Sequence, residues 1–124
     1  MERLFFGLGA GAAFLAVATG AFGAHGLASY FQSHPDLESI YHTAVQYLFF
    51  HAFGLIAAAW ASTRFGNSLP VAAGFLFLAG MILFSGSLYV LALTGARWWG
   101  AVTPLGGLAF LAGWALLIWT AVKG

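Results

Sequence analysis

Four long apolar stretches, separated where charged residues fall, fill almost all of the 124-residue sequence. A run of about 18 or more apolar residues is long enough to cross the roughly 30 Å hydrocarbon core of a bilayer as a helix. Charged residues make up 6% of the chain. Soluble domains carry about 25%, so this sequence lacks the polar side chains to cover a water-facing surface. The pattern predicts a polytopic membrane protein.

The four predicted spans form a single domain over residues 1–124. Because the hydrocarbon core holds no water, every backbone polar group must be satisfied inside the protein, and we expect four helices packed as an antiparallel four-helix transmembrane bundle in an all-α membrane protein. Pro35, Pro70 and Pro104 fit the first turns of helices. The predicted spans cover about residues 4–29, 35–62, 69–93 and 101–122.

Orientation is predicted from the basic residues, which concentrate on the cytoplasmic side of membrane proteins. Arg3, Arg64 and Lys123 fall on the side that holds both termini, and Arg97 falls on the other side. This distribution favours cytoplasmic N- and C-termini. We therefore expect a multi-pass protein of the cell inner (plasma) membrane, surrounded by the lipid bilayer.

Glycine spacing predicts where helices approach closely. Small residues let the backbones of membrane helices come together, and van der Waals packing drives helix association where lipid removes the hydrophobic drive. Several glycines repeat every third or fourth residue along one span. The predicted packing positions are Gly7, Gly11, Gly20, Gly23, Gly26, Gly106, Gly107 and Gly113.

Polar side chains within the spans gather at one depth. With both termini inside, they all fall in the outer half of the bundle or near its midplane, whereas the inner half is almost entirely Ala, Leu, Phe, Val and Gly. Polar groups at membrane depth tend to face the bundle interior or a cavity. We expect a polar pocket formed by His25, His42, Gln46, Tyr47, His51, Ser85, Ser87, Tyr89 and Thr103.

The second span divides its polar residues between two helical stripes. At about 100° per residue, His42 and Gln46 share one stripe, and Thr43, Tyr47 and His51 share the other. We expect the second stripe to face the bundle centre, with His51 hydrogen-bonded to a serine, a tyrosine or a backbone carbonyl of another span. His51 then either links two helices or acts as a ligand or proton carrier.

Several kinds of chemistry are disfavoured by what the sequence lacks. The chain has no cysteine, which excludes disulfides and thiolate chemistry, and its four Lys and Arg residues form no patch for nucleic acid. Glu2, Asp36 and Glu38 all lie at span ends or in a loop, so paired-acid catalysis is not expected. We expect no cofactor, although the histidines leave a haem or copper site open as an alternative.

Four segments resemble one known family. They are GAFGAHGL (residues 20–27), YHTAVQY (41–47, leading to His51), FSGSLY (84–89) and TPLGG (103–107, followed by Gly113 and Trp114). Together and in this order they resemble the domain of unknown function 423 family, to which the eukaryotic transmembrane protein 256 group is related. The resemblance covers nearly the whole chain. It implies a small four-span protein of the bacterial inner membrane, and it brings no established activity.

Three functions remain open on the sequence alone. The first, which we favour, is a non-enzymatic membrane component, either an accessory subunit of a larger membrane complex or a homo-oligomer. The second is a carrier or channel for a small neutral or weakly basic solute that enters through the outer polar pocket. The third is a membrane protein that binds haem or copper through its histidines.

Overall fold

The computed structural model describes residues 1–124, which form four long helices and two short connecting elements. The first, second and fourth long helices are α1 (Glu2–His25), α3 (Pro35–Arg64) and α6 (Thr103–Lys123). The third is continuous but changes type, as α4 (Leu69–Gly80), the π-helix η1 (Met81–Ser85) and α5 (Gly86–Thr94). The short helix α2 (Ala28–Ser33) and the 3₁₀ turn η2 (Arg97–Ala101) connect the spans.

Proline and glycine mark the helix boundaries. Pro35 and Pro104 lie in the first turns of α3 and α6, where the missing N–H has no helical partner to lose. The backbone of Gly95 is left-handed, with φ of +73°, and its N–H donates to the carbonyl of Leu91 to close α5. A residue with a side chain would be strained there, so Gly95 allows the sharp turn into η2.

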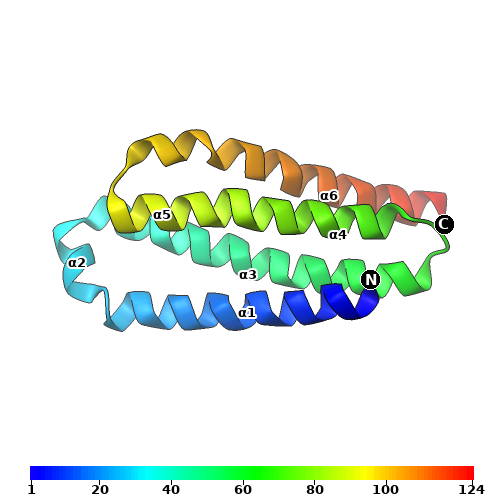
Figure 1. The fold of residues 1–124 in the computed structure, drawn as a ribbon, viewed down its shortest axis with the longest axis horizontal. Helices are drawn as coiled ribbons and strands as arrows, with labels where there is room; N and C mark the ends of the chain where they lie inside the picture. Colours follow the sequence, from blue (N-terminus) through cyan, green and yellow to red (C-terminus); the bar gives the residue numbers. More distant parts are fainter.

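The four spans run antiparallel and form an elongated bundle (Figure 1). α1 and α6 lie at its opposite edges, and α3 and the α4–η1–α5 helix are stacked between them. Both termini lie at the same end, which we call the terminal end; α2 and η2 form the opposite, loop end. Each of the four helices is apolar and long enough to cross a membrane. The predicted all-α transmembrane bundle is confirmed.

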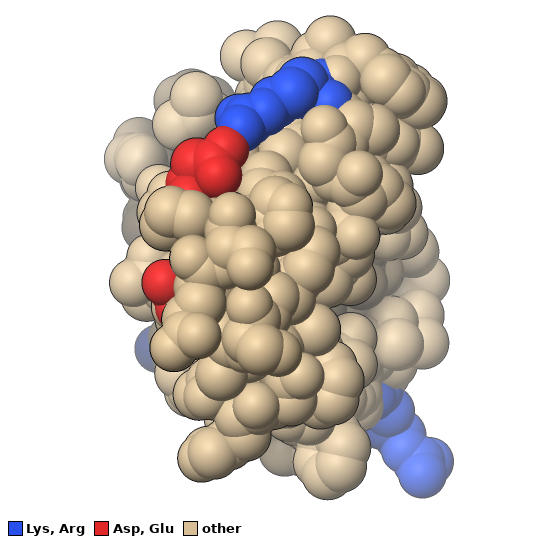
Figure 2. Space-filling view, turned by 90° about the vertical axis from the view of Figure 1, so that its left-hand side faces the viewer, with Lys and Arg blue, Asp and Glu red and all other residues tan.

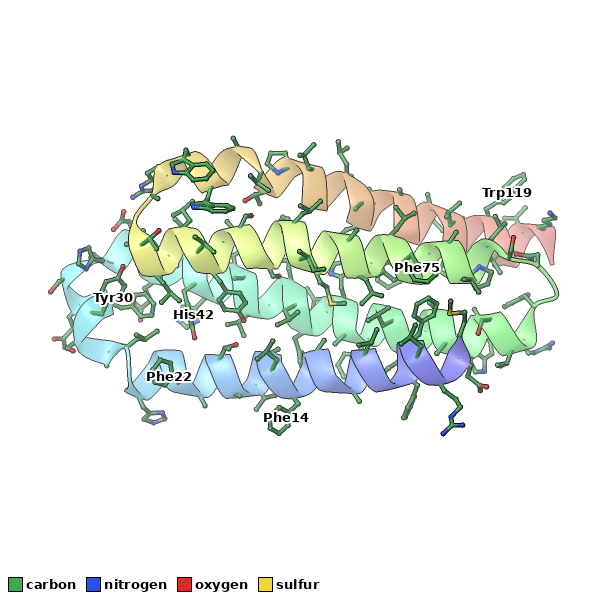
Figure 3. The ribbon with its side chains drawn as sticks, in the orientation of Figure 1. Phe14, Phe22, Tyr30, His42, Phe75 and Trp119 are labelled. Atoms are coloured by element: carbon green, nitrogen blue, oxygen red, sulfur yellow. The ribbon has the colours of Figure 1, made fainter.

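The core is built mainly from the two central helices. Phe5 of α1, Leu55 of α3, Phe77 of α4 and Phe110 of α6 are almost fully buried and pack in one cluster. A second cluster at the loop end joins α2, α3 and α5. The edge helices expose most of their apolar side chains: Phe14 on α1 and Trp119 on α6 point away from the bundle (Figure 3). Those faces are suited to contact lipid.

The π-helix shifts the sequence positions that are buried in the third span by one residue and keeps them on one side of the helix. Up to Gly80 the buried positions follow Ala73 and Phe77, and after η1 they follow Ser85, Leu88 and Ala92. An uninterrupted α-helix at 3.6 residues per turn would carry the first stripe about one residue, or 100°, away from the second. The wider i→i+5 turn of η1 absorbs that residue. The apolar residues of this segment do not indicate a π-turn.

Close helix packing uses some of the predicted glycines and not others. A Cβ built on Gly23 would lie 2.3 Å from the Tyr41 ring, and one on Gly106 would lie 2.3 Å from the backbone N of Phe84. Gly113 lies against Phe77, and Gly20 makes an ordinary contact with Val45. At these positions a neighbouring helix lies directly above the glycine backbone.

The prediction that Gly7 and Gly11, the GxxxG pair of α1, pack against another helix is wrong. Gly7 and Gly11 have nothing within 4 Å of their built Cβ positions, because the partner helix lies on the other side. Gly9 is the α1 glycine that meets α3, with the Ala52 carbonyl 2.8 Å from its built Cβ. The atoms nearest to a Cβ built on Gly26 belong to Phe22 of the same helix, and a Cβ built on Gly107 has its nearest neighbour at 3.9 Å. Spacing missed the closely packed glycines Gly9, Gly74 and Gly80.

Charged side chains are confined to the ends of the bundle. At the loop end, Arg97 of η2 forms an ion pair with Asp36 in the first turn of α3 (Figure 2). Arg3, Arg64 and Lys123 lie at the terminal end. Both partners of the ion pair are exposed, so we expect its contribution to stability to be at most about 1 kcal/mol. The ion pair also links η2 to the first turn of α3.

Candidate functional site

The predicted pocket residues do not converge on one cavity. The structure divides them between separate hydrogen bonds that join pairs of helices and an exposed group on the outer face of α3. No buried side-chain nitrogen or oxygen lacks a hydrogen-bond partner. The polar residues are therefore described contact by contact.

Thr19 joins three helices near the loop end. The Tyr41 hydroxyl of α3 donates to the Thr19 backbone carbonyl of α1. The Thr19 hydroxyl donates to the Leu15 carbonyl at 2.9 Å, so at its 2.7 Å contact with the Tyr89 hydroxyl of α5 it accepts. The rings of Tyr41 and Tyr89 meet edge to face, with centroids 5.5 Å apart. Polar and aromatic contacts thus hold α1, α3 and α5 together.

Two serines of the third span bond to different neighbours. Ser85, at the end of η1, is buried and donates to the Ala44 carbonyl of α3 at 2.8 Å. Ser87 donates to the Phe84 carbonyl of its own helix at 3.0 Å and accepts from the Thr103 hydroxyl of α6 at 2.6 Å. The register change at η1 places Ser85 toward α3 and Ser87 toward α6. Both serines link helices.

His51 lies at the centre of an aromatic group between α3 and α6. Its side chain is buried and stacks on the Phe110 ring, with centroids 3.5 Å apart and planes 6° from parallel. The indole Nε1 of Trp114 lies 2.9 Å from its Nε2, and its Nδ1 lies 2.9 Å from the Tyr47 carbonyl. We expected a serine, tyrosine or backbone carbonyl of another span as its partner; the partner is a tryptophan.

These two bonds fix the protonation of His51. An indole nitrogen only donates, so Nε2 must accept, and the proton is on Nδ1, which donates to the Tyr47 carbonyl. The imidazole is therefore neutral, with both nitrogens engaged. A protonated ring would set its Nε2–H against the Trp114 N–H. In this arrangement His51 has no free nitrogen for a ligand, a metal or a proton.

The remaining pocket residues are exposed. His25 and Gln46 lie on outer faces of α1 and α3, and the Nδ1 of His25 contacts only the Ala21 carbonyl of its own helix. His42 is exposed, with its Nε2 3.9 Å from the Glu38 carboxylate one turn away. Tyr47 is 37% exposed and its hydroxyl has no partner. No three His, Asp or Glu side chains gather to hold a metal ion.

Two residues of these contacts were missed from the sequence. Trp114 lies near the middle of α6, far from the interfacial belts where tryptophan is usual, and an indole N–H at that depth needs a hydrogen-bond partner. That depth was the available signal. For Thr19 the sequence carried no comparable signal, because a threonine in a helix commonly hydrogen-bonds to a carbonyl of its own helix.

Open grooves with mostly apolar walls lie on the surface of the bundle. The α3–α6 groove has a volume of about 560 Å³ and includes Tyr47, His51 and Trp114 in its walls. Another, of about 460 Å³, lies between α1 and α3 beside Gln46 and Phe50. Few hydrogen-bonding groups face these grooves, so they suit apolar chains better than a hydrated solute.

These features define a small integral membrane protein: four apolar spans, charges only at the ends and polar side chains used between helices. The sequence profile described as "Protein of unknown function (DUF423)" matches residues 19–107. The chain belongs to this family, and it is a protein of the inner (plasma) membrane.

Curated relatives agree with this placement. The chain is 46% identical over 123 residues to UPF0382 membrane protein YwdK of Bacillus subtilis, covering 98% of each chain. It is 45% identical to a UPF0382 membrane protein of Staphylococcus haemolyticus, covering 98% of this chain and 97% of the relative. It is 43% identical to the UPF0382 inner membrane protein YgdD of Escherichia coli K12, covering 89% of this chain and 82% of the relative. No solved structure matches significantly.

Proposed function

We propose that the protein is a non-enzymatic structural component of the inner membrane that acts by lateral association, as an accessory subunit of a larger complex or as a homo-oligomer. The observation that carries this proposal is the use of its polar groups. Every buried polar side-chain atom is hydrogen-bonded within the chain. A catalyst or carrier needs polar groups left available to its substrate, whereas a structural component needs a stable bundle with outer faces for partners.

The edge helices supply such faces. α1 and α6 are the least buried spans, and their outward apolar side chains include Phe14 and Trp119. Residues 1–124 form spans and short connections, so the partner contacts they make fall within the membrane or at its surfaces. We further propose that both termini are cytoplasmic. Three basic residues at the terminal end, Arg3, Arg64 and Lys123, against Arg97 alone at the loop end, support this orientation.

Association can be tested by isolating the protein at native expression level in a mild detergent that retains lipid. We expect native gels and light scattering to show a species larger than the 13.0 kDa monomer, either with a constant partner or as several copies. A monodisperse monomer, with no partner and no cross-linked product in intact membranes, would contradict the proposal.

A flux measurement separates this proposal from the carrier hypothesis. In liposomes loaded with small neutral or weakly basic solutes, we expect the wild type, the His51→Ala variant and protein-free vesicles to release them at the same rate. Faster release with the wild type, lost in His51→Ala, would support a carrier and contradict a purely structural role.

A further inference from the structure

The outward face of α3 carries polar side chains that no other part of the chain satisfies. Gln46 is exposed and its amide makes no hydrogen bond, and the hydroxyl of its neighbour Tyr47 also has no partner. Phe50 and Phe53 continue this face toward the terminal end, each 54% exposed. We call the surface formed by Gln46, Tyr47, Phe50 and Phe53 the α3 ridge.

Gln46 lies within the hydrocarbon layer. α3 has 30 residues and is about 45 Å long at 1.5 Å per residue. A centred hydrocarbon core of roughly 30 Å leaves about 8 Å of helix outside at each end. Gln46 is about 16 Å from the start of α3, and so about 8 Å inside the apolar layer. Acyl chains neither donate nor accept hydrogen bonds, so its amide is unsatisfied in the single chain.

The surroundings of the α3 ridge fit another helix. The ridge stands between the α1–α3 groove, whose walls include Gln46 and Phe50, and the α3–α6 groove, whose walls include Tyr47. A projecting helix with a groove on each side is complementary to a copy of itself, because the ridge of each copy can lie in a groove of the other. Gln46, Phe50 and Phe53 are exposed, so no other helix of the chain covers this face.

We propose that the α3 ridge binds a second copy of this chain about a two-fold axis that passes close to Gln46. This inference rests on the proposed function, lateral association, and names the surface and the partner. An amide both donates and accepts, so two Gln46 side chains related by the axis satisfy each other. Every copy inserts in the same direction, which puts the two amides at the same depth. A lipid cannot supply this pairing.

Cross-linking through single cysteines tests the proposal, because the natural chain has none. Under a two-fold axis a residue meets its own copy only near that axis, and a disulfide needs Cα atoms within about 7 Å. In intact membranes treated with copper phenanthroline, we expect Gln46→Cys to form a disulfide-linked dimer, and Phe50→Cys and Phe53→Cys to form less. Phe14→Cys and Ile118→Cys, on the outer faces of α1 and α6, are controls at positions more exposed than Phe50 and Phe53.

Each result has a different meaning. A dimer at Gln46 with little at Phe14 and Ile118 supports the ridge. Equal dimer at all positions, or dimer only at the controls, overturns it. Adducts with a different protein, without a homodimer, overturn the second-copy assignment but leave lateral association standing. Absence of any adduct, together with a monomer in native gels, contradicts both proposals.

The amide itself is tested by substitution. Gln46→Leu removes the hydrogen bonds but fills similar space, and we expect self-association to weaken on the order of three- to twenty-fold in a fluorescence energy transfer titration in liposomes. Gln46→Asn retains the amide and should keep more of the affinity. Because Gln46 touches no polar group of its own chain, the thermal stability of the monomer should be unchanged. Equal association of Gln46→Leu and wild type would contradict the role of the amide.

Discussion

The indole Nε1 of Trp114 donates to the Nε2 of His51 at 2.9 Å, and this bond joins α6 to α3 near mid-membrane. Phe110 covers the same imidazole, so a polar contact and an aromatic stack act on one ring. With Nδ1 donating to the Tyr47 carbonyl, the histidine is fully satisfied and neutral. The geometry is that of a link between helices and does not leave a ligand position.

Replacing Trp114 by Phe should destabilise the bundle. The buried Nε2 of His51 would lose its donor, and interhelical hydrogen bonds in membranes are worth roughly 0.6–2 kcal/mol. Thermal unfolding in detergent measures the loss. Trp119→Phe is the matched control, since Trp119 is an exposed tryptophan of the same helix with no hydrogen bond to the chain. Equal melting temperatures for the two variants would mean that the His51 bond contributes nothing.

The α1 glycines give a second prediction. Gly9→Ala should be destabilising by about 1–3 kcal/mol, because the new methyl would meet the Ala52 carbonyl at 2.8 Å and α1 would have to move away from α3. Gly11→Ala should be neutral or slightly stabilising, since its methyl meets nothing and alanine is the better helix former. Chemical unfolding of both variants in the same detergent makes the comparison. A larger loss in Gly11→Ala would contradict the packing described for α1.

The neighbouring glycines of α6, Gly106 and Gly107, give a third prediction. A methyl on Gly106 would lie 2.3 Å from the backbone N of Phe84, which has no freedom to swing aside, whereas a methyl on Gly107 would have 3.9 Å of space. We expect Gly106→Ala to lose about 1–3 kcal/mol and to be retained poorly in membranes, with Gly107→Ala close to wild type. Expression level and melting temperature check this. Two variants of equal stability would place α6 further from η1 than the structure does.

The proposed orientation in the membrane gives a fourth prediction. If basic residues hold the terminal end in the cytoplasm, a fluorescent protein fused after Gly124 should fluoresce, and alkaline phosphatase fused there should be inactive. Phosphatase inserted after Gly95, at the loop end, is the reciprocal control and should be active. The opposite pattern would invert the orientation and place the loop end in the cytoplasm.

The spans were predictable because hydropathy and helix length suffice to define them, and prolines at 35 and 104 give their starts. Orientation of side chains around the helices was only partly predictable. His51 is buried and Gln46 is exposed on one helix, as predicted when the second stripe was assigned to the bundle centre, but Tyr47 of that same stripe is 37% exposed. Gly7 and Gly11 match a packing motif, yet their spacing does not reveal on which side α3 lies. That depends on tertiary contacts between helices distant in sequence.

The register change in the third span was beyond sequence reasoning for a different reason. Residues 81–85 are apolar or small in either hydrogen-bonding pattern, so composition does not distinguish an α-turn from the wider one. What selects η1 is the need to present Gly80 to α6 and Ser85 to α3. Trp114 and Thr19 were missed similarly, since each gains its role from a partner on another helix.

The wider turn also makes the third span tolerant of one particular deletion. Removing one residue between Met81 and Ser85 would restore ordinary α-helical winding and leave Gly86–Thr94 on the faces they now occupy, because η1 holds one residue more than an α-turn needs. Tyr89 would still face Thr19, and Ser87 would still face Thr103. The contacts at the loop end therefore do not depend on the length of this segment, because the π-turn takes up the surplus residue.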